Sequence, residues 1–498
     1  MMLGNLYAET LKLEYVNRII QPLTVVGPLN RDIRGVTHDS RQVRPGFLFV
    51  ALPGQHQSGA RFIEEAVQRG AVAVVSESTG GLRPDITLIR VEDARRALAE
   101  IACAFYNHPA RHLQLIGITG TNGKSTISFM CRDMLKADGR APGLLGTIRY
   151  EIGDRLIPAG RTTPEAPDIQ SMLSQMVNVG CRSAVMEVSS HGLDQKRTWG
   201  LDFDVGVFTN LTQDHLDYHQ TMPAYFAAKA LLFRGLGQLE KKAFAAINLD
   251  DAWGQQLAGT GGLNARIVTF GLHPGAAVRA AEVAVGARGA DFQVVTPWGA
   301  QRIHIGLLGR HNVSNALAAL AGCGALGVPL PTMAAALAVM PPVPGRLDPV
   351  PNDRGFQVFV DYAHTDDALA HVLATLRELT ARRVLVVFGC GGNRDQAKRP
   401  LMGAAVARLA DYAIVTSDNP RSEAPEAIIA QIVPGFGAAK NFEVEADREK
   451  AIARALALAQ PGDIVLLAGK GHENVQEFAH TIVPFDDRDI AARLLKKK

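Results

Sequence analysis

Short apolar runs alternate with segments of helical periodicity along most of the chain. Near the start, FLFVAL (47–52) is followed by ARFIEEAVQRG (60–70) and then by AVAVVSE (71–77). Runs rich in β-branched and aromatic residues indicate buried strands, and apolar positions three and four apart indicate a helix. The first part of the chain is therefore predicted to be a small α/β unit.

The same alternation is repeated from about residue 111 to 340, and again near the C-terminus in VFVDYAH (358–364), ARRVLVVFGCGG (381–392), DYAIVTSDNPR (411–421) and DIVLLAGKGHE (463–473). Repeated strand-then-helix units predict parallel sheets with helices on both faces. Ligands of such sheets bind beyond the carboxyl ends of the strands. PPVPGRLDPV (341–350) has four prolines and is typical of a linker.

These patterns predict an α/β protein of three domains, at residues 1–110, 111–343 and 344–498. The length of 498 residues agrees with three domains. With 47% hydrophobic and 20% charged residues, the chain can form packed cores. A formal charge of +3 gives no sign of nucleic-acid or membrane-surface binding.

Five cysteines without Cys-x-x-Cys spacing, and a start that lacks a secretory signal pattern, predict a cytoplasmic protein. The alanine-rich segment 316–340 is interrupted by glycine and proline, which favours short packed helices over a membrane span.

The strongest candidate for chemistry is GITGTNGKST (117–126), which lies between an apolar run and a helical segment. Backbone N–H groups of such a turn can hold phosphate oxygens, Lys124 can reach terminal phosphates, and Ser125 or Thr126 can place a hydroxyl on Mg²⁺. The usual P-loop glycine five residues before Gly123 is replaced by Ile118, so a plain surface turn remains an alternative.

Further candidates follow other predicted strands. Glu187 ends the strand predicted from AVME (184–187) and is placed as an Mg²⁺ ligand, with a solvated loop residue as the alternative. The box Asp214-His215-x-Asp217-x-His219 suggests a transition metal, but its spacing fits no zinc pattern. Lys229 lies among apolar residues of a predicted helix, where lysine commonly extends to solvent.

TGTNGKST resembles the nucleotide loop of the Mur ligase family, ATP-dependent enzymes that join amino acids onto UDP-N-acetylmuramic acid, and of the related folylpolyglutamate synthetases. The resemblance extends over nearly the whole chain, and it implies a UDP-binding first domain, a central P-loop ATPase domain and a Rossmann-like amino-acid-binding third domain. It implies ATP as co-substrate, two Mg²⁺ ions, small-molecule substrates and a monomer. It also implies that Lys229 carries a CO₂-derived carbamate, which would be an oxygen ligand for Mg²⁺ beside Ser125, Glu187 and His215.

The resemblance assigns further residues to each substrate. For ATP they are Gly120, Thr121, Asn122, Gly123, Lys124, Ser125, Thr126, Asn315, Arg346 and Asp361. For the UDP-linked muramoyl peptide they are Ser40, Gln55, His56, Gln57, Thr162, Thr163, Ser189, Gln195 and Arg197. For the amino acid they are Arg394, Asp418, Asn419, Pro420, Arg421, Gly469 and Glu473.

Taken alone, Asn315 is a common helix-capping residue, and Asp418-Asn419-Pro420-Arg421 is an ordinary turn. Within the resemblance, that tetrapeptide is the motif by which a Mur ligase selects meso-diaminopimelate, with Arg421 on the distal carboxylate. The implied catalytic residues are Lys124, Glu187, His215 and Lys229, acting through an acyl phosphate. A lysine-adding Mur ligase, a folylpolyglutamate synthetase and a non-enzymatic P-loop switch remain the alternatives.

Overall fold

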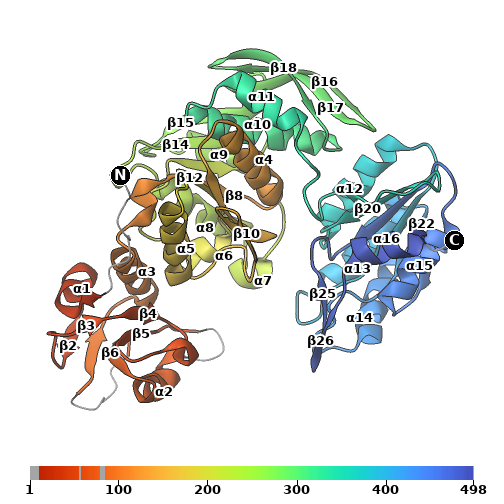
Figure 1. Ribbon diagram of the computed structural model, residues 1–498. Helices are drawn as coiled ribbons and strands as arrows, with labels where there is room; N and C mark the ends of the chain where they lie inside the picture. Colours follow the sequence, from red (N-terminus) through yellow and green to blue (C-terminus); the bar gives the residue numbers. More distant parts are fainter. Residues whose placement is uncertain (1–9, 55–57, 79–84, 497–498) are drawn as a thin grey trace.

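The computed structural model describes residues 10–54, 58–78 and 85–496, and it contains three large sheets that follow one another along the chain (Figure 1). We call the parts that carry them the N-terminal, central and C-terminal units. Each unit combines a mostly parallel sheet with helices, which confirms the α/β class predicted from the strand-helix alternation.

The N-terminal unit has a five-stranded sheet in the order β2-β7-β6-β5-β4. All neighbours are parallel except β2 and β7. Apolar side chains on its two faces pack against α1 and α3 on one side and against α2 on the other. The elements are β2 (Thr24–Val26), β7 (Thr87–Arg90), β6 (Ala71–Ser76), β5 (Phe47–Ala51), β4 (Gly35–Thr37), α1 (Leu13–Ile20), α2 (Ile63–Gln68) and α3 (Ala94–Phe105).

The central unit has an eleven-stranded sheet in the order β11-β10-β9-β12-β8-β13-β14-β15-β16-β17-β18. Strands β9 to β16 of this order are parallel, as predicted. Their bounds are β9 (Pro142–Leu145), β12 (Ser183–Glu187), β8 (Gln114–Thr119), β13 (Val205–Phe208), β14 (Phe244–Asn248), β15 (Arg266–Gly271) and β16 (Val278–Gly286).

Both edges of this sheet are antiparallel, which the prediction of a purely parallel sheet missed. They consist of β10 (Arg149–Ile152), β11 (Arg155–Pro158), β17 (Gly289–Thr296) and β18 (Gly299–Ile305). Buried and solvated positions alternate along much of β16 to β18, so these strands form hairpins with one face in water.

Helices cover both faces of the central sheet. One face packs against α4 (Lys124–Ala137), α10 (Arg310–Ala325) and α11 (Leu330–Ala338). The other packs against α5 (Ala166–Asn178), α6 (Ser190–Asp194), α8 (Met222–Gly235) and α9 (Ala252–Gly259). The alanine-rich segment thus forms two short packed helices, as predicted. Among the described residues, no helix has the length and apolar character needed to cross a membrane.

The C-terminal unit has a six-stranded sheet in the order β19-β20-β24-β21-β22-β23, parallel except for the edge pair β19 and β20. One face packs against α12, α13 and α14, and the other against α15 and α16. The elements are β19 (Asp348–Pro349), β20 (Gln357–Asp361), β24 (Ile464–Ala468), β21 (Val384–Phe388), β22 (Tyr412–Val415), β23 (Phe442–Val444), α12 (Asp366–Leu379), α13 (Lys398–Leu409), α14 (Pro425–Ile432), α15 (Arg448–Leu458) and α16 (Asp487–Lys496).

The proline-rich segment 341–350 is only in part the linker that its composition predicts. Val343 is fully buried, and Asp348 already belongs to the C-terminal sheet as the first residue of β19. The Asp348 carboxylate accepts two hydrogen bonds from Arg488, at 2.6 and 2.7 Å. This pairing explains why the segment is fixed against the C-terminal unit.

The C-terminal unit also contains a fully buried ion pair between Arg448 of α15 and Asp487 of α16, with N···O 2.6 Å and both side chains 0% exposed. Arg448 further donates to the carbonyl oxygens of Ser417 (3.2 Å) and Ala468 (2.9 Å). The guanidinium therefore ties two helices to the loop after β22 and to the last residue of β24.

We expect Asp487→Ala to destabilise the C-terminal unit by about 3–5 kcal/mol, because it leaves the Arg448 charge buried and unpaired. Hydrogen exchange of the β24 amides measures this loss. The control is Glu449→Ala, which breaks the exposed Glu449–Arg493 pair between the same two helices. It should cost less than about 1 kcal/mol. Equal losses in the two variants would contradict the expectation.

Candidate active site

The predicted phosphate loop lies between the end of β8 at Thr119 and the start of α4 at Lys124. Gly120 and Gly123 have φ of +151° and +88°. A Cβ atom at Gly120 would lie 1.8 Å from Thr209 Oγ1, and one at Gly123 would lie 2.4 Å from Asn315 Oδ1. Both positions therefore require glycine, which argues against an ordinary surface turn.

Lys124 folds back over this loop. Its Nζ donates to the carbonyl oxygens of Gly120 (2.9 Å) and Thr121 (2.8 Å). Burial lowers the pKa of the Lys124 ammonium. A buried cation held at a glycine loop, in front of a helix N-terminus, is a suitable partner for phosphate oxygens.

A cavity of about 300 Å³ opens beside the loop. It is lined from the central unit by α4 and α10 and from the C-terminal unit by β20 and α12. Most of the predicted ATP residues line it, namely Asn122, Gly123, Ser125, Thr126, Asn315, Arg346 and Asp361. Gly120, Thr121 and Lys124 form the adjoining loop. The structure therefore brings together the nucleotide residues that were predicted from the sequence.

Asn312 and Asn315 are not helix caps, because α10 starts at Arg310 and both lie inside it. The Asn315 Nδ2 donates to Asn312 Oδ1 at 2.8 Å. Burial lowers the pKa of the neighbouring His311 to about 4, so that ring is neutral at pH 7. The wall of this cavity is therefore polar and, at these side chains, uncharged.

Glu187 is the last residue of β12 and is fully buried, so it is not a solvated loop residue. Its Oε2 accepts hydrogen bonds from Ser125 Oγ (3.0 Å) and Thr147 Oγ1 (2.8 Å), and its Oε1 accepts from Thr147 N (2.9 Å). The carboxylate thus lies beside the hydroxyl that follows the phosphate loop. Thr147 is a site residue that sequence reasoning missed.

Lys229 of α8 does not extend to solvent, because only 1% of it is exposed. Its Nζ donates to the Gly120 carbonyl at 2.8 Å and lies 4.6 Å from the centre of the Tyr225 ring. Burial, and then the nearby Lys124 charge, hold the pKa of Lys229 well below its usual range. A lysine in this position readily becomes a neutral amine.

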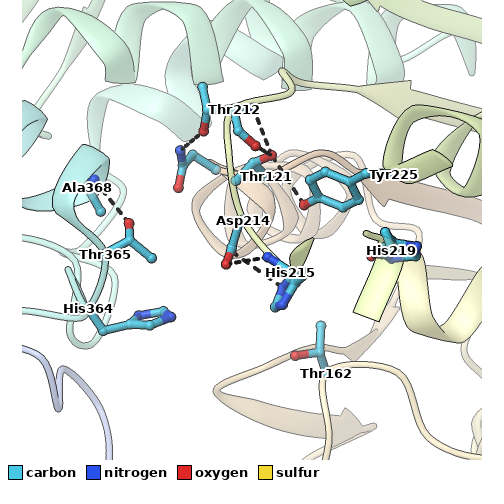
Figure 2. Close-up of polar contacts among 12 residues, drawn as sticks. Thr121, Thr162, Thr212, Asp214, His215, His219, Tyr225, His364, Thr365 and Ala368 are labelled. Atoms are coloured by element: carbon cyan, nitrogen blue, oxygen red, sulfur yellow. Dashed lines mark hydrogen bonds and ion pairs between the residues drawn. The ribbon is translucent and has the colours of Figure 1, made fainter. Parts of the chain in front are cut away.

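His215 immediately precedes α7 (Leu216–His219), with φ of +54°. Figure 2 shows it beside Asp214, below the loop residue Thr121 and across from His364 of the C-terminal unit. The His215 Nε2 lies 3.4 Å from an Asp214 carboxylate oxygen. Burial nevertheless lowers the pKa of His215 to about 4, so the ring is neutral at pH 7.

Of the predicted box, Asp214 stays beside His215, whereas His219 has other partners. The His219 ring is hydrogen-bonded to Ser190 Oγ at 2.9 Å and stacks on Tyr225. Within the described residues, no three His, Cys, Asp or Glu side chains are grouped as a metal site.

A second cavity, of about 560 Å³, lies between the central and C-terminal units. The predicted muramoyl-peptide residues and the predicted amino-acid residues face each other across it. From the central unit it is lined by Thr162, Thr163, Ser189, Arg197 and His215. From the C-terminal unit it is lined by Arg394, Asp418, Asn419, Arg421, Gly469 and Glu473.

Hydrogen bonds fix the central wall of this cavity. Thr163 Oγ1 donates to the Glu187 carbonyl (2.9 Å) and accepts from Ser189 N (2.9 Å). Arg197 donates to the Thr163 carbonyl (2.8 Å) and to Gln195 Oε1 (2.6 Å). Gln195 therefore supports Arg197 without lining the cavity.

The opposite wall is the loop after β22, residues 417–421, which contains Pro420. Asn419 Nδ2 donates to Glu473 Oε2 at 2.7 Å, and Asn419 Oδ1 accepts from the fully buried Lys470 at 3.1 Å. Burial, and then Asp418, raise the pKa of Glu473. Arg421 lies 2.7 Å from Glu477 Oε2. Lys470 and Glu477 were not predicted, because neither belongs to the turn motif.

The predicted uridine residues lie in the N-terminal unit. Ser40, in a short 3₁₀ helix (Ser40–Gln42), is buried and donates to Glu65 Oε2 at 2.7 Å. It lines neither of the two cavities described above. Gln55, His56 and Gln57 lie outside the described residues.

Comparison with known families gives three successive matches. Residues 32–106 match the Mur ligase family catalytic domain, residues 118–323 the Mur ligase middle domain, and residues 345–471 the Mur ligase glutamate ligase domain. Together they cover most of the chain.

Similar proteins include two named UDP-N-acetylmuramoyl-L-alanyl-D-glutamate--2,6-diaminopimelate ligase. The one from Geobacillus kaustophilus is 46% identical and covers 94% of this chain and 96% of its own. The one from Geobacter metallireducens is 44% identical and covers 98% and 99%.

A solved structure with the same protein name has a TM-score of 0.69 at 34% identity and covers 98% of this chain and 99% of its own. A MurF ligase structure from Thermotoga maritima in complex with ADP has a TM-score of 0.61 at 19% identity, covers 93% and 98%, and shares the fold. The matches in sequence extend through all three units and agree with the architecture of the site. The chain belongs to the Mur ligase family.

Proposed function

We propose that this protein is an ATP-dependent ligase that adds meso-diaminopimelate to UDP-N-acetylmuramoyl-L-alanyl-D-glutamate during peptidoglycan precursor synthesis. The observation that carries the proposal is the 560 Å³ cavity, where Arg421, Asp418 and Asn419 face the central unit's Thr162 and Arg197. Relatives at 44–46% identity over nearly the whole chain carry the name of a 2,6-diaminopimelate ligase.

ATP is assigned to the cavity beside the glycine loop, with Lys124 near the terminal phosphates. The residues at its inner end suit Mg²⁺, because Ser125 and Glu187 offer oxygen atoms and are already within 3.0 Å of each other. A bound Mg²⁺ would neutralise charge that develops on phosphoryl oxygens. We assign two Mg²⁺ ions to this site. A carbamate on Lys229 and the side chain of His215 are their further protein ligands.

The two substrates meet in the large cavity. The D-glutamate side-chain carboxylate attacks the γ-phosphorus of ATP, the bond to the β,γ-bridging oxygen breaks, and ADP leaves. The diaminopimelate amine then attacks the acyl carbon, loses a proton and expels phosphate. The Lys124 ammonium stabilises negative charge on the phosphoryl oxygens, and the neutral His215 ring can donate a hydrogen bond at the reacting centre.

The diaminopimelate side chain is placed against the C-terminal unit. Arg421 binds its distal carboxylate, and Asp418 and Asn419 meet the amino group and backbone of the amino acid. Arg394, Pro420, Gly469 and Glu473 complete the site. A guanidinium offers two parallel N–H donors that match a carboxylate. The muramoyl peptide is placed against Thr162, Thr163, Ser189, Gln195 and Arg197, and its uridine nucleotide near Ser40 and residues 55–57.

The domain division at 1–110, 111–343 and 344–498 is part of the proposal and is supported by the three separate sheets. We also infer a monomer, which is what the resemblance to the family implies. A cytoplasmic location is supported by the five cysteines, all of which are free.

The alternatives are a lysine-adding Mur ligase and a folylpolyglutamate synthetase. ATP hydrolysis by purified protein, measured with UDP-muramoyl dipeptide and each amino acid in turn, separates them. We expect phosphate release only when dipeptide and diaminopimelate are both present. Release with lysine, or with a folate and glutamate, would support the respective alternative. Nucleotide binding without any turnover would indicate a non-enzymatic switch.

The role of Lys229 can be tested by chemical rescue. Lys229→Ala should nearly abolish turnover, because the variant cannot form a carbamate, and short-chain carboxylic acids should restore part of it by occupying the vacated space. Lys124→Ala is the matched control, since an added carboxylate cannot replace an ammonium. Wild-type turnover of Lys229→Ala would rule out the carbamate.

Arg421→Ala should reduce kcat/KM for diaminopimelate by roughly 30-fold to several thousandfold, since losing a charged hydrogen-bonded pair costs about 2–5 kcal/mol. KM for ATP and for the UDP-dipeptide should change little. Lysine activity need not appear, because removing Arg421 does not create a site for the lysine side chain. Unchanged diaminopimelate kinetics in steady-state assays would refute the assignment of this loop.

A further inference from the structure

Strand β25 (Val475–Phe478), in the hairpin with β26 (Thr481–Pro484), lies against the loop 417–421 that carries Arg421. Glu477 of β25 makes two main-chain contacts with this loop. Its N–H donates to Asn419 Oδ1 at 3.1 Å, and its carbonyl accepts from Arg421 N at 2.9 Å. The backbone of one residue thus fixes both ends of the Asn419-Pro420-Arg421 segment.

The Glu477 side chain makes a third contact. Its Oε2 lies 2.7 Å from Nε of Arg421, and the two side chains are 37% and 27% exposed. The Arg421 Nη1 also donates to the Gly392 carbonyl at 3.0 Å. The guanidinium is therefore held on two sides by groups of the C-terminal unit.

The two residues of this pair differ in their relation to the large cavity. Arg421 lines it, but Glu477 is not among the described residues that form its wall. Glu477 therefore contacts Arg421 from behind. The Arg421 backbone is itself in the left-handed region, with φ of +51°, and this conformation is stabilised by the pairing with β25.

We propose that Glu477 is a positioning residue for the recognition of diaminopimelate, acting through Arg421. The inference rests on the proposed function. An arginine side chain loses rotamer freedom when it grips a carboxylate, and a partner that fixes it beforehand reduces that loss. Glu477 also offsets part of the Arg421 charge, which lowers the repulsion between the guanidinium and the ammonium on the same distal carbon of diaminopimelate.

Glu477→Ala tests the side chain alone, because both main-chain contacts of residue 477 remain. We expect KM for diaminopimelate to rise about three- to fivefold, as for loss of a half-exposed ion pair. The kcat and the KM values for ATP and UDP-dipeptide should stay within about twofold of wild type. Glu477→Gln keeps an oxygen acceptor beside Nε and should restore part of the lost affinity.

Glu443→Ala is the matched control, since Glu443 forms a comparable pair with Arg454 in the same unit, with N···O 2.9 Å. It should leave all KM values unchanged. Thermal unfolding of each variant shows whether it is folded.

A double-variant cycle tests whether Glu477 acts through Arg421. Adding Glu477→Ala to Arg421→Ala should have no further effect on KM for diaminopimelate. An unchanged KM in the single Glu477→Ala variant, or an equal rise with and without Arg421, would overturn the positioning role. A wild-type enzyme that does not consume diaminopimelate would overturn the proposed function instead, so the two failures are distinguishable.

Discussion

The fully buried Lys229 and the partly buried Lys124 share one carbonyl oxygen, and the arrangement of the site depends on this contact. Lys124 and Lys229 donate to Gly120 O at 2.9 and 2.8 Å, from helices on opposite faces of the central sheet. Burial lowers the pKa of both, and the Lys124 charge further lowers the pKa of Lys229. The carboxylates of Glu187 and Asp214 act in the opposite direction on Lys124. A carbamate on Lys229 would place an anion, in place of an amine, beside the Lys124 ammonium.

The sequence predicts those parts of the site that follow from local pattern. The parallel centre of the middle sheet, the glycine loop after β8 and Glu187 at the end of β12 all follow from apolar runs that end in polar residues. Because parallel strands end at one edge, residues far apart in sequence, such as Ser125 and Glu187, are brought within 3.0 Å. The Asp418-to-Arg421 motif also reaches the expected cavity.

Other features depend on pairings that no local pattern encodes. The antiparallel strands β17 and β18 extend the central sheet although their sequence does not distinguish an edge hairpin from a separate one. Thr147 is not part of a motif, yet it supplies two of the three hydrogen bonds to the Glu187 carboxylate. Glu477 follows Arg421 by more than fifty residues and reaches it only because β25 folds back onto the loop. Such supporting residues are identified from the three-dimensional structure and not from the sequence.

The Glu477 contact changes the physical account of substrate choice. Considered alone, Arg421 would select diaminopimelate over lysine both by binding a carboxylate and by repelling an ammonium. With Glu477 at 2.7 Å, part of the guanidinium charge is offset at short range, so repulsion is weaker than the sequence suggests. Under the proposed assignment of this loop, selection would then depend mainly on hydrogen bonds whose geometry a carboxylate satisfies and whose absence leaves donors of Arg421 unpaired. Fixing the guanidinium strengthens this mode of selection, because a guanidinium held in one position forms its hydrogen bonds only with a carboxylate that is correctly placed.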